Sequence, residues 1–203
     1  MAQLELVHPR ESGEPRGDHS VITHLVDEGA RVLDVGCGDG ALLALLAREC
    51  KTRGSGLERN PNLVRASIAR GLSAAQGDAD ADLADFPSGT FDVVILSHTL
   101  QQLRDPRAAL KQAARIGARV IISIKNAAYT PARARLAFGG RAANWDQLHR
   151  PISVRDMAEL ARACGLTIET AVPLTKGRAG APFAKVLWRA NWFAEEAVFL
   201  LQS

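Results

Sequence analysis

The chain has 203 residues, a length that suits one globular domain with a full core and is short for two. Its apolar share of 47% and its charged share of 23% are those of an average globular protein. The formal net charge is only +3. The basic side chains in excess after residue 122 are scattered rather than clustered, which favours a solvated surface over a nucleic-acid or phosphate site.

Export and membrane insertion are not expected from the sequence. No apolar run approaches the roughly eighteen residues that a membrane helix needs. Residues 1–10 lack a basic flank followed by an apolar stretch, so they do not have the form of a signal peptide. The three cysteines, Cys37, Cys50 and Cys164, have no CxxC spacing. They indicate reduced thiols in a cytoplasmic protein, and they argue against a disulfide framework or a metal site.

The N-terminal segment differs in composition from the rest of the chain. Residues 1–17 are rich in Pro and Gly and are predicted to form a flexible arm, and residues 18–203 are predicted to form a single domain. A short helix should begin at Asp18 and run to Glu28, where Gly29 ends it.

From residue 31 onward, short apolar runs alternate with helical patterns, which is typical of a parallel sheet built from βαβ units. Asp105 followed by Pro106 is a standard helix start. The expected strands are Arg31–Val35, Arg53–Glu58, Ala74–Gly77, Phe91–Leu96 and Arg119–Ile124, and the expected helices between them are Gly40–Cys50, Asn60–Arg70 and Asp105–Ala114.

The last third of the chain has a different pattern. Residues 125–150 are predicted to be helix plus loop, and Ser153 with Asp156 has the spacing of a capping box whose helix stops at Gly165. Two strands are then expected, at Leu166–Leu174 and Phe183–Ala190, joined by a loop. A direct strand–loop–strand connection predicts an antiparallel pair at one edge of the sheet.

The strongest local motif is a glycine-rich turn, in which a buried strand ends at Gly36 and Gly38 and a helix follows at once. These glycines let the backbone turn tightly and approach a ligand, and the helix N-terminus presents free N–H donors. Gly36, Gly38 and Ala41 also satisfy the looser fingerprint of an NAD-dependent dehydrogenase, which stays an alternative.

Three acidic positions weigh against the dehydrogenase. Asp34 lies two residues before Gly36, where it would repel a pyrophosphate but attract a ligand that carries an ammonium and a sulfonium. Glu58 ends the second strand and can accept hydrogen bonds from ribose hydroxyls, in either class of cofactor. Asp78 follows the third strand beside the small Ala79, where its carboxylate can accept from an adenine amino group.

Together these features resemble the class I S-adenosylmethionine (SAM)-dependent methyltransferases. The resemblance implies an α/β, Rossmann-like fold with a mostly parallel seven-stranded sheet and an antiparallel edge strand, binding SAM or S-adenosylhomocysteine. It implies the aminoacyl group at the glycine turn, the ribose at the second-strand acid and adenine at the Gly-Asp segment. The expected cofactor contacts are Asp34, Gly36, Cys37, Gly38, Glu58, Asp78, Ala79 and Ser97.

A narrower resemblance rests on residues 31–40, 76–87 and 91–101, which look like the MetW family of methionine-biosynthesis proteins. The acidic run after Gly77-Asp78 is its most specific part, and the likeness extends from residue 16 to about residue 122 and thins after Ser123. It implies a small-molecule ligand and a role beside homoserine O-acyltransferase, with feedback sensing of SAM as the pathway's end product. A stand-alone methyltransferase acting on a small molecule is the alternative.

The acceptor side offers only a weak catalytic candidate, His98, after the fourth strand. A neutral imidazole there could act as a general base, but a polar residue that lines the pocket is the favoured interpretation. His149 is interpreted as an ordinary loop histidine. The segment Ser97–Leu100 is not the Asn/Asp-Pro-Pro-aromatic signature of enzymes that methylate nucleic-acid amino groups, and no Pro-Cys dipeptide is present. Both observations argue against a nucleic-acid partner.

The three tryptophans, Trp145, Trp188 and Trp192, all lie in the last third, and an apolar run continues over residues 192–201. Packing of this tail within the monomer is the favoured interpretation. Contact with a partner is the alternative, because Trp and Phe are common anchors in interfaces.

Overall fold

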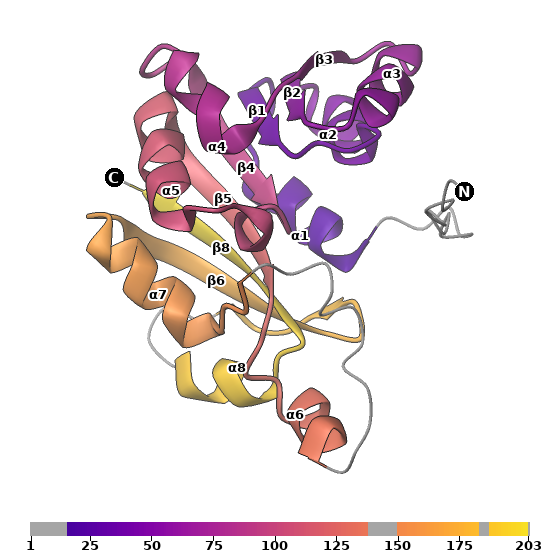
Figure 1. Cartoon of the computed structure of the whole chain (residues 1–203). Coiled ribbons are helices and arrows are strands. Elements are labelled where there is room, and N and C mark those ends of the chain that lie inside the picture. Colours follow the sequence, from indigo (N-terminus) through magenta and orange to yellow (C-terminus); the bar gives the residue numbers. More distant parts are fainter. Residues whose placement is uncertain (1–15, 138–149, 183–186, 203) are drawn as a thin grey trace, which may run out of the picture.

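One mixed sheet forms the centre of the molecule (Figure 1). The computed structural model describes residues 16–137, 150–182 and 187–202. The sheet has eight strands in the order β3-β2-β1-β4-β5-β8-β6-β7, so the expected count of seven is one too low. Strands β1 to β5 are parallel to one another, and β8 runs antiparallel to both of its neighbours, β5 and β6.

The elements follow the expected alternation closely as far as β5. The strands are β1 (Arg31–Val35), β2 (Arg53–Glu58), β3 (Ser73–Gln76), β4 (Phe91–Ser97), β5 (Gly117–Lys125), β6 (Thr167–Thr175), β7 (Arg178–Ala179) and β8 (Glu196–Gln202). The helices are α1 (Gly17–Leu25), α2 (Ala41–Cys50), α3 (Pro61–Ala69), α4 (Ala79–Asp82), α5 (Pro106–Ile116), α6 (Thr130–Ala137), α7 (Val154–Ala163) and α8 (Leu187–Phe193), with short 3-10 turns at Leu83–Asp85 and Leu100–Gln102.

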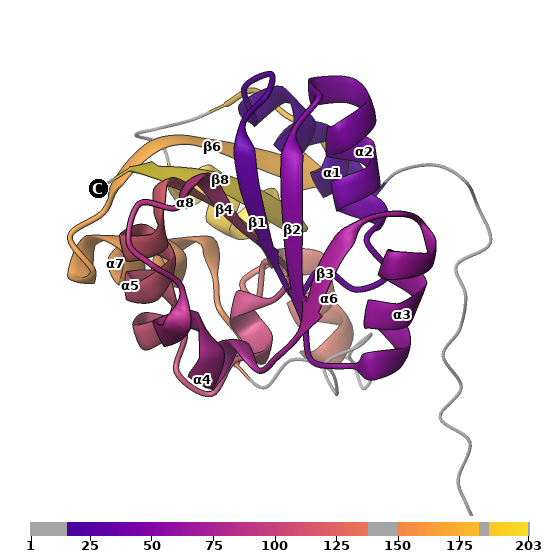
Figure 2. The same ribbon diagram turned by 90° about the horizontal axis from the view of Figure 1, so that it is seen from above.

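Helices cover both faces of the sheet, with α1 and α2 on one side and α5 and α7 on the other (Figure 2). Side chains of β1 alternate between the two resulting cores: Val32 packs with α1 and α2, and Leu33 and Val35 pack with α5. The alternation turns Asp34 toward the α1 side, directly before the glycine turn. The order of strands reverses between β1 and β4, which is where open α/β sheets bind ligands.

Both helix-start predictions are confirmed. The Asp105 carboxylate accepts a hydrogen bond from the Ala108 N–H at the start of α5. At the start of α7 the Ser153 hydroxyl accepts from the Asp156 N–H, and the Asp156 carboxylate accepts from the Ser153 N–H, which completes the capping box. Gly165 follows this helix with a φ of 78°.

The prediction for residues 183–190 is wrong. Residues 183–186 lie outside the described part of the chain, and 187–193 form helix α8 rather than a strand. The expected antiparallel pair at the sheet edge is confirmed, but it joins β6 to the short strand β7, and the other antiparallel partner of β6 is β8, which lies inside the sheet between β5 and β6. Its run from Ala197 to Leu201 is buried throughout, since a strand with neighbours on both sides and helices on both faces has no polar surface. The apolar tail is therefore largely core.

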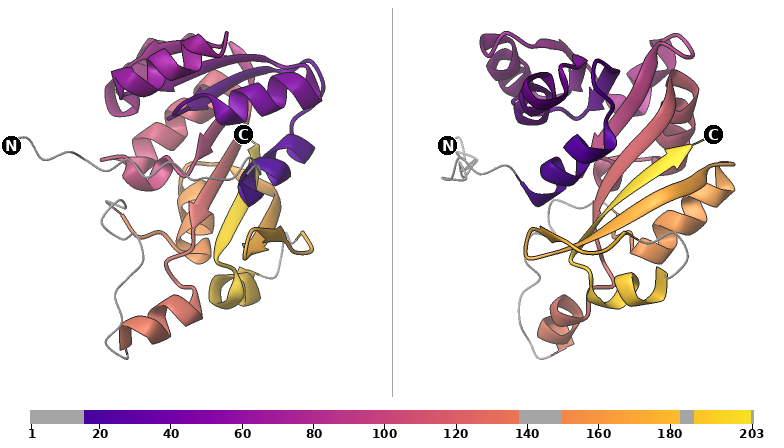
Figure 3. Two further views of the ribbon diagram at one scale, coloured as in Figure 1. Left: turned by 90° about the vertical axis from the view of Figure 1, so that its right-hand side faces the viewer. Right: turned by 180° about the vertical axis from the view of Figure 1, so that it is seen from behind.

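The end of the molecule beyond the sheet is formed by α6 and α8 (Figure 3). The Thr130 hydroxyl donates to the Trp192 carbonyl, and the Arg133 guanidinium lies 5.9 Å from the centre of the Trp192 ring. Trp192 and Phe193 stay exposed. Trp145 and His149 lie outside the described residues. Among the described helices, none is long and apolar enough to cross a membrane.

Candidate functional site

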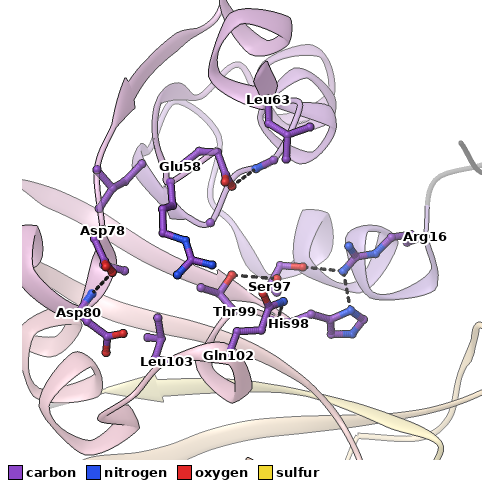
Figure 4. Close-up of a pocket in the computed structure, with 16 residues that line it drawn as sticks. Arg16, Glu58, Leu63, Asp78, Asp80, Ser97, His98, Thr99, Gln102 and Leu103 are labelled. Atoms are coloured by element: carbon purple, nitrogen blue, oxygen red, sulfur yellow. Dashed lines mark hydrogen bonds between the residues drawn. The ribbon is translucent and has the colours of Figure 1, made fainter. Parts of the chain in front are cut away.

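A cavity of about 300 Å³ lies over the carboxyl ends of β1 to β4 (Figure 4). It is bounded by the glycine turn after β1, the acid that ends β2, the Gly-Asp segment after β3 and the polar residues that end β4. Its lining residues are Arg16, Gly36, Gly38, Leu57, Glu58, Arg59, Leu63, Gly77, Asp78, Ala79, Asp80, Ser97, His98, Thr99, Gln102 and Leu103. Parallel strands end at the same edge of a sheet, so segments far apart in sequence meet here.

The glycine turn combines one close contact, at Gly36, with one open position, at Gly38. Gly36 and Gly38 have φ angles of 76° and 58°, which side-chain-bearing residues rarely adopt. A Cβ on Gly36 would lie 2.4 Å from the Thr99 hydroxyl oxygen, so this glycine lets β1 and the end of β4 approach. A Cβ on Gly38 would meet nothing within 4 Å, so the backbone there borders open space that a ligand can fill.

Cys37 fills a space in the core of the turn. The side chain is 7% exposed, and a Cβ on Gly56 of β2 would lie only 2.4 Å from its sulfur. Burial raises the pKa of the Cys37 thiol to about 12, and the charges of Asp34 and Glu58 add to the effect. The thiol is thus uncharged at neutral pH and has no nucleophilic character.

Glu58 joins the end of β2 to the glycine turn. Its Oε2 accepts from the Gly38 N–H at 3.0 Å, and its Oε1 accepts from the Asn60 N–H at 2.7 Å. An ionised carboxylate can accept about four hydrogen bonds. Each Glu58 oxygen therefore keeps capacity for a further donor from the cavity.

Asp78 is partly committed to its own chain segment. Its carboxylate caps α4 by accepting from the Asp80 N–H at 3.0 Å, and it accepts from the Arg104 guanidinium at 3.1 Å. Asp80 in turn accepts from the backbone N–H groups of Arg104 and Asp105. These contacts fix the segment at the cavity wall, with Ala79 beside it.

Asp34 lies beneath the glycine turn and is 2% exposed. It borders a smaller recess shared with Gly36 and Cys37, and among the described residues its Oδ1 has no hydrogen-bond partner. Burial raises the pKa of Asp34 to about 7, the charge of Arg16 opposes the rise, and the charges of Asp18 and Glu58 add to it. An unpartnered buried carboxylate is costly, and a cationic group bound beside it would relieve the cost.

An unexpected network closes the other side of the cavity. Asp18 is fully buried, and its Oδ2 accepts from Arg16 at 2.6 Å, from the Ser97 hydroxyl at 2.8 Å and from the Ser123 hydroxyl at 2.8 Å. Burial alone would raise the pKa of Asp18, but the hydrogen bond from Arg16 and the positive charge of that guanidinium hold it well below its usual range. Asp18 is therefore a fixed negative charge that positions Arg16.

His98 contacts the same arginine. The residue has a φ of 54°, and its Nδ1 lies 3.0 Å from an Arg16 guanidinium nitrogen. A guanidinium has no lone pair to offer, so Arg16 donates and a neutral His98 carries its proton on Nε2. Nε2 lies 3.8 Å from the Asp18 carboxylate and 3.6 Å from Glu196. In this arrangement His98 offers an N–H to its surroundings and has no free lone pair to take a proton from a substrate.

Asp18, His98 and Glu196 also place three ligand-type atoms within 4.8 Å of one another. The Arg16 guanidinium already bonds Asp18 and His98, however, and its positive charge opposes a second cation between them. The cluster is better described as an arginine-centred ion network than as a metal centre.

The structure thus brings every expected contact residue to one edge of the sheet. Gly36, Gly38, Glu58, Asp78, Ala79, Ser97 and His98 line the main cavity, and Asp34 and Cys37 border the adjoining recess. Sequence analysis missed Arg16, which it assigned to the flexible arm, and Asp18, which it assigned only to a helix. A buried acid at the first turn of an otherwise apolar helix face was the available signal for Asp18.

The profile of the family described as "Methionine biosynthesis protein MetW" matches residues 16–201. A curated relative, the bifunctional methionine biosynthesis protein MetXA/MetW of Rhodopirellula baltica, is 32% identical over 133 residues, 62% of this chain and 21% of that protein. The ubiquinone biosynthesis O-methyltransferase of Xanthomonas oryzae is 37% identical over 120 residues, 55% of this chain and 49% of the enzyme. The matched region is thus less than half the length of either relative.

The fold is also that of a solved SAM-dependent methyltransferase from Thermotoga maritima, with a TM-score of 0.68 over 92% of this chain and 87% of that one. Sequence identity between the two is 18%, so this likeness concerns the fold.

Proposed function

The chain belongs to the family of methionine biosynthesis protein MetW, and from that premise we propose that it binds SAM and acts with a homoserine O-acyltransferase. The observation that supports SAM binding is the Glu58 carboxylate. It ends β2, accepts a hydrogen bond from the glycine turn, and can still accept further hydrogen bonds from a ligand. The residues present fit the cofactor: Gly38 leaves open space above the backbone, and Asp34 has an unpartnered buried oxygen.

Each part of the cofactor has a residue of suitable chemistry in the cavity. Glu58 would accept from the ribose hydroxyls, and the backbone at Gly36 and Gly38 would approach the aminoacyl group. Asp34 would lower the energy of the ammonium and sulfonium through its charge. Asp78 and Ala79 would border the adenine, with Ser97 near the reacting end. When bound, SAM supplies an electrophilic methyl group and two positive charges.

The partner half of the proposal is supported by the Rhodopirellula relative, whose name joins MetXA and MetW in one protein. In this chain the candidate contact surface is α8, where Trp192 is 47% exposed and Phe193 is 63% exposed. Large aromatic side chains are frequent anchors at interfaces. A cytoplasmic location and a single domain over residues 18–203 are parts of the same proposal, and the three unpaired cysteines favour the former.

Co-expression with a homoserine O-acyltransferase tests the partner half. We expect the two proteins to co-purify, acyl transfer to rise, and added SAM to alter that activity. The double variant Trp192→Ala/Phe193→Ala should weaken association without lowering the melting temperature, because both side chains are exposed. Ile68→Ala, which removes another exposed apolar side chain (53% exposed), is the matched control.

A second function, methylation of a small molecule by this chain alone, is favoured by the likeness to the Xanthomonas O-methyltransferase. The purified chain would then turn over without a partner, at a rate on the order of 1–1,000 per second. The arrangement of His98 argues against it, because the ring has no free lone pair for a substrate proton. Turnover at such a rate, with no effect on the acyltransferase, would replace the accessory function with this one.

A further inference from the structure

A second cavity, of about 580 Å³, lies next to the first on the far side of His98. The two share Arg16, His98 and Gln102, so a group in one can reach a group in the other past the imidazole. The remaining walls come from the last third of the chain, which supplies Lys125 at the end of β5, Lys176 in the turn between β6 and β7, and Glu196 at the start of β8. Its volume is that of a small-molecule site.

The sheet brings charges of both signs together in this cavity. Lys125 and Glu196 are paired in the antiparallel register of β5 and β8, so their side chains leave the same face of the sheet. That face is the one that also carries Ile121 and Val198, on the side covered by α1. The Lys125 ammonium and the Glu196 carboxylate nevertheless form no ion pair within 4.0 Å, and Glu196 instead lies 3.6 Å from His98 Nε2.

The ammonium groups of Lys125 and Lys176 are available to bind a ligand. Within the described ranges, neither Lys125 nor Lys176 has a carboxylate within 4.0 Å of its ammonium. The neighbouring acid, Glu195, accepts from the Lys176 backbone N–H at 3.1 Å and so holds the turn rather than the ammonium. Besides Arg16, which Asp18 holds, and Glu195, which holds the turn, the cavity therefore has two lysine ammonium groups and the Glu196 carboxylate, and these three groups form no ion pair with one another.

The N-terminus of α1 forms one wall of the second cavity. A Cβ on Gly17 would lie 2.4 Å from the carbonyl oxygen of Gly177, so the helix start and the β6–β7 turn touch through their backbones. This contact keeps Arg16 between the two cavities, where Asp18 already holds its guanidinium. The walls are thus fixed by a backbone contact and by an ion pair whose acidic partner, Asp18, is fully buried.

We propose that this second cavity binds a small zwitterionic metabolite, with its carboxylate at Lys125 and Lys176 and its ammonium at Glu196. A simple anion could pair with the lysines but would leave Glu196 without a partner, and a simple cation would be repelled by the two lysines. A ligand with both charges satisfies all three groups through charge-assisted hydrogen bonds. The inference rests on the proposed function in one respect, that the first cavity holds the nucleoside.

Three matched probes test the charge requirement: L-2-aminobutyrate, butyrate, which lacks the amine, and n-propylamine, which lacks the carboxylate. Each is titrated into the full chain saturated with S-adenosylhomocysteine and followed by NMR, so that the first cavity cannot take the probe. We expect L-2-aminobutyrate to bind at least tenfold more tightly than either single-charge probe. Equal affinities for the three probes would overturn the inference.

Charge-neutral variants locate the site. Glu196→Gln should weaken L-2-aminobutyrate at least tenfold and remove its advantage over butyrate, and Lys125→Gln should remove its advantage over n-propylamine. The matched controls are Glu169→Gln and Lys111→Gln, both exposed positions outside the cavity. Losses of the same size in the controls would contradict the assignment, and melting temperatures identify any variant that fails to fold.

Failure of the inference and failure of the proposed function give different results. Binding of S-adenosylhomocysteine is measured separately by calorimetry in every variant, and we expect it to stay within about threefold of the original chain. If that ligand does not bind at all, the cofactor proposal is wrong, and the three probes are compared without it. If it binds but the probes are not distinguished, only the zwitterion site is wrong.

Discussion

The two ends of the sheet carry function in different ways. On the side of β1 to β4, the cavity is built from residues that end strands or lie within two residues of a strand end, namely Gly36, Glu58, Asp78 and Ser97. On the side of β5, β6 and β8, the second cavity combines Arg16 with Lys125, Lys176 and Glu196, which come from distant parts of the chain. The first side uses local strand–turn–helix units, and the second depends on the order in which the strands assemble.

The difference shows where local pattern is informative. A positive φ after a parallel strand favours glycine, and Gly36 and Gly38 therefore mark the turn after β1 in the sequence itself. No comparable requirement marks Lys125 or Glu196, which look like ordinary surface charges until the β5–β8 register pairs them. The predictions below test this contrast, from the largest expected effect to the smallest.

The first prediction concerns the burial of β8 inside the sheet. Phe199 is fully buried among residues of β5, α7 and α8, whereas Phe193 is 63% exposed. Phe199→Ala should reduce the free energy of unfolding by about 3–5 kcal/mol through lost burial and the cavity left behind. Chemical denaturation measures the loss, and Phe193→Ala is the matched control, with a change within about 0.5 kcal/mol.

If the two variants lose equal stability, β8 is not a core strand, and the second cavity has no fixed wall. For the same reason a chain that ends after Phe193 should not fold, since it leaves β5 and β6 without their shared neighbour. Circular dichroism of that truncated chain checks this, and a cooperative melt at the original temperature would contradict it.

The second prediction concerns Asp34, whose pKa burial raises to about 7 in the folded chain, against about 3.9 in an unfolded chain. The folded state holds this proton more tightly, so the stability it contributes is full below about pH 4 and is lost as the pH rises through about 7. Relative to the original chain, Asp34→Asn should therefore gain stability over that window, by up to about 4 kcal/mol.

Denaturation at several pH values measures that difference, with Asp85→Asn as the baseline for loss of an exposed carboxyl. The difference isolates Asp34 from groups that act the other way, such as His19, whose pKa burial lowers to about 4 despite the opposing charge of Asp18. The folding stability that His19 contributes is therefore lost as the pH falls. A pH-independent difference for Asp34→Asn would show that folding does not raise the pKa of Asp34.

Asp34 also links the fold to the cofactor. Binding of a ligand with two positive charges beside it should lower its pKa and release a proton near pH 6.5. Calorimetry in buffers with different ionisation enthalpies counts that proton, and Asp34→Asn should abolish the release. Proton uptake on binding would contradict the placement of the cationic end of SAM.

The third prediction concerns the ribose acid. Glu58→Ala should weaken SAM binding by roughly 1.5–3 kcal/mol, because it removes a charged acceptor. Calorimetry with SAM, S-adenosylhomocysteine and NAD measures this, and the first two should bind whereas NAD should not. Glu49→Ala, an exposed change at the end of α2, is the control. Tighter binding of NAD than of SAM would favour the dehydrogenase alternative.

Much of the fold could be predicted because strand ends, glycine turns and helix caps are local. The strands and helices expected between residues 31 and 124 lie within a few residues of their expected bounds, although the short helix α4 was not expected, and the expected cofactor contacts lie at one sheet edge. The failures are non-local. Residues 187–193 form a helix where a strand was expected, and β8 enters between β5 and β6, a position that depends on which strands pair rather than on residue type.

Arg16 illustrates the same limit within the site. Its neighbours Pro15 and Gly17 suggest a loose arm, yet a buried acid two residues later holds its guanidinium. A glycine is needed at position 17 only because the backbone of Gly177, 160 positions later in the chain, leaves no room for a side chain there. Neither contact has a signature in the neighbouring sequence.

The last prediction concerns the local signal that the sequence does carry in the last third, the capping box of α7. Ser153→Ala removes the hydroxyl that accepts from the Asp156 N–H at 3.1 Å, and it should cost about 1 kcal/mol of unfolding free energy. Asp105→Ala should cost a similar amount at α5, where the carboxylate accepts from the Ala108 N–H at 3.0 Å. Ser153→Asn keeps a capping side chain and is the control, with a loss of a few tenths at most. Equal costs at the two caps would mean that local signals contribute as much to stability in the last third as in the cofactor half. A negligible cost for Ser153→Ala alone would mean that α7 is held by its packing on β6, and that the contrast between the two regions extends to their helix starts.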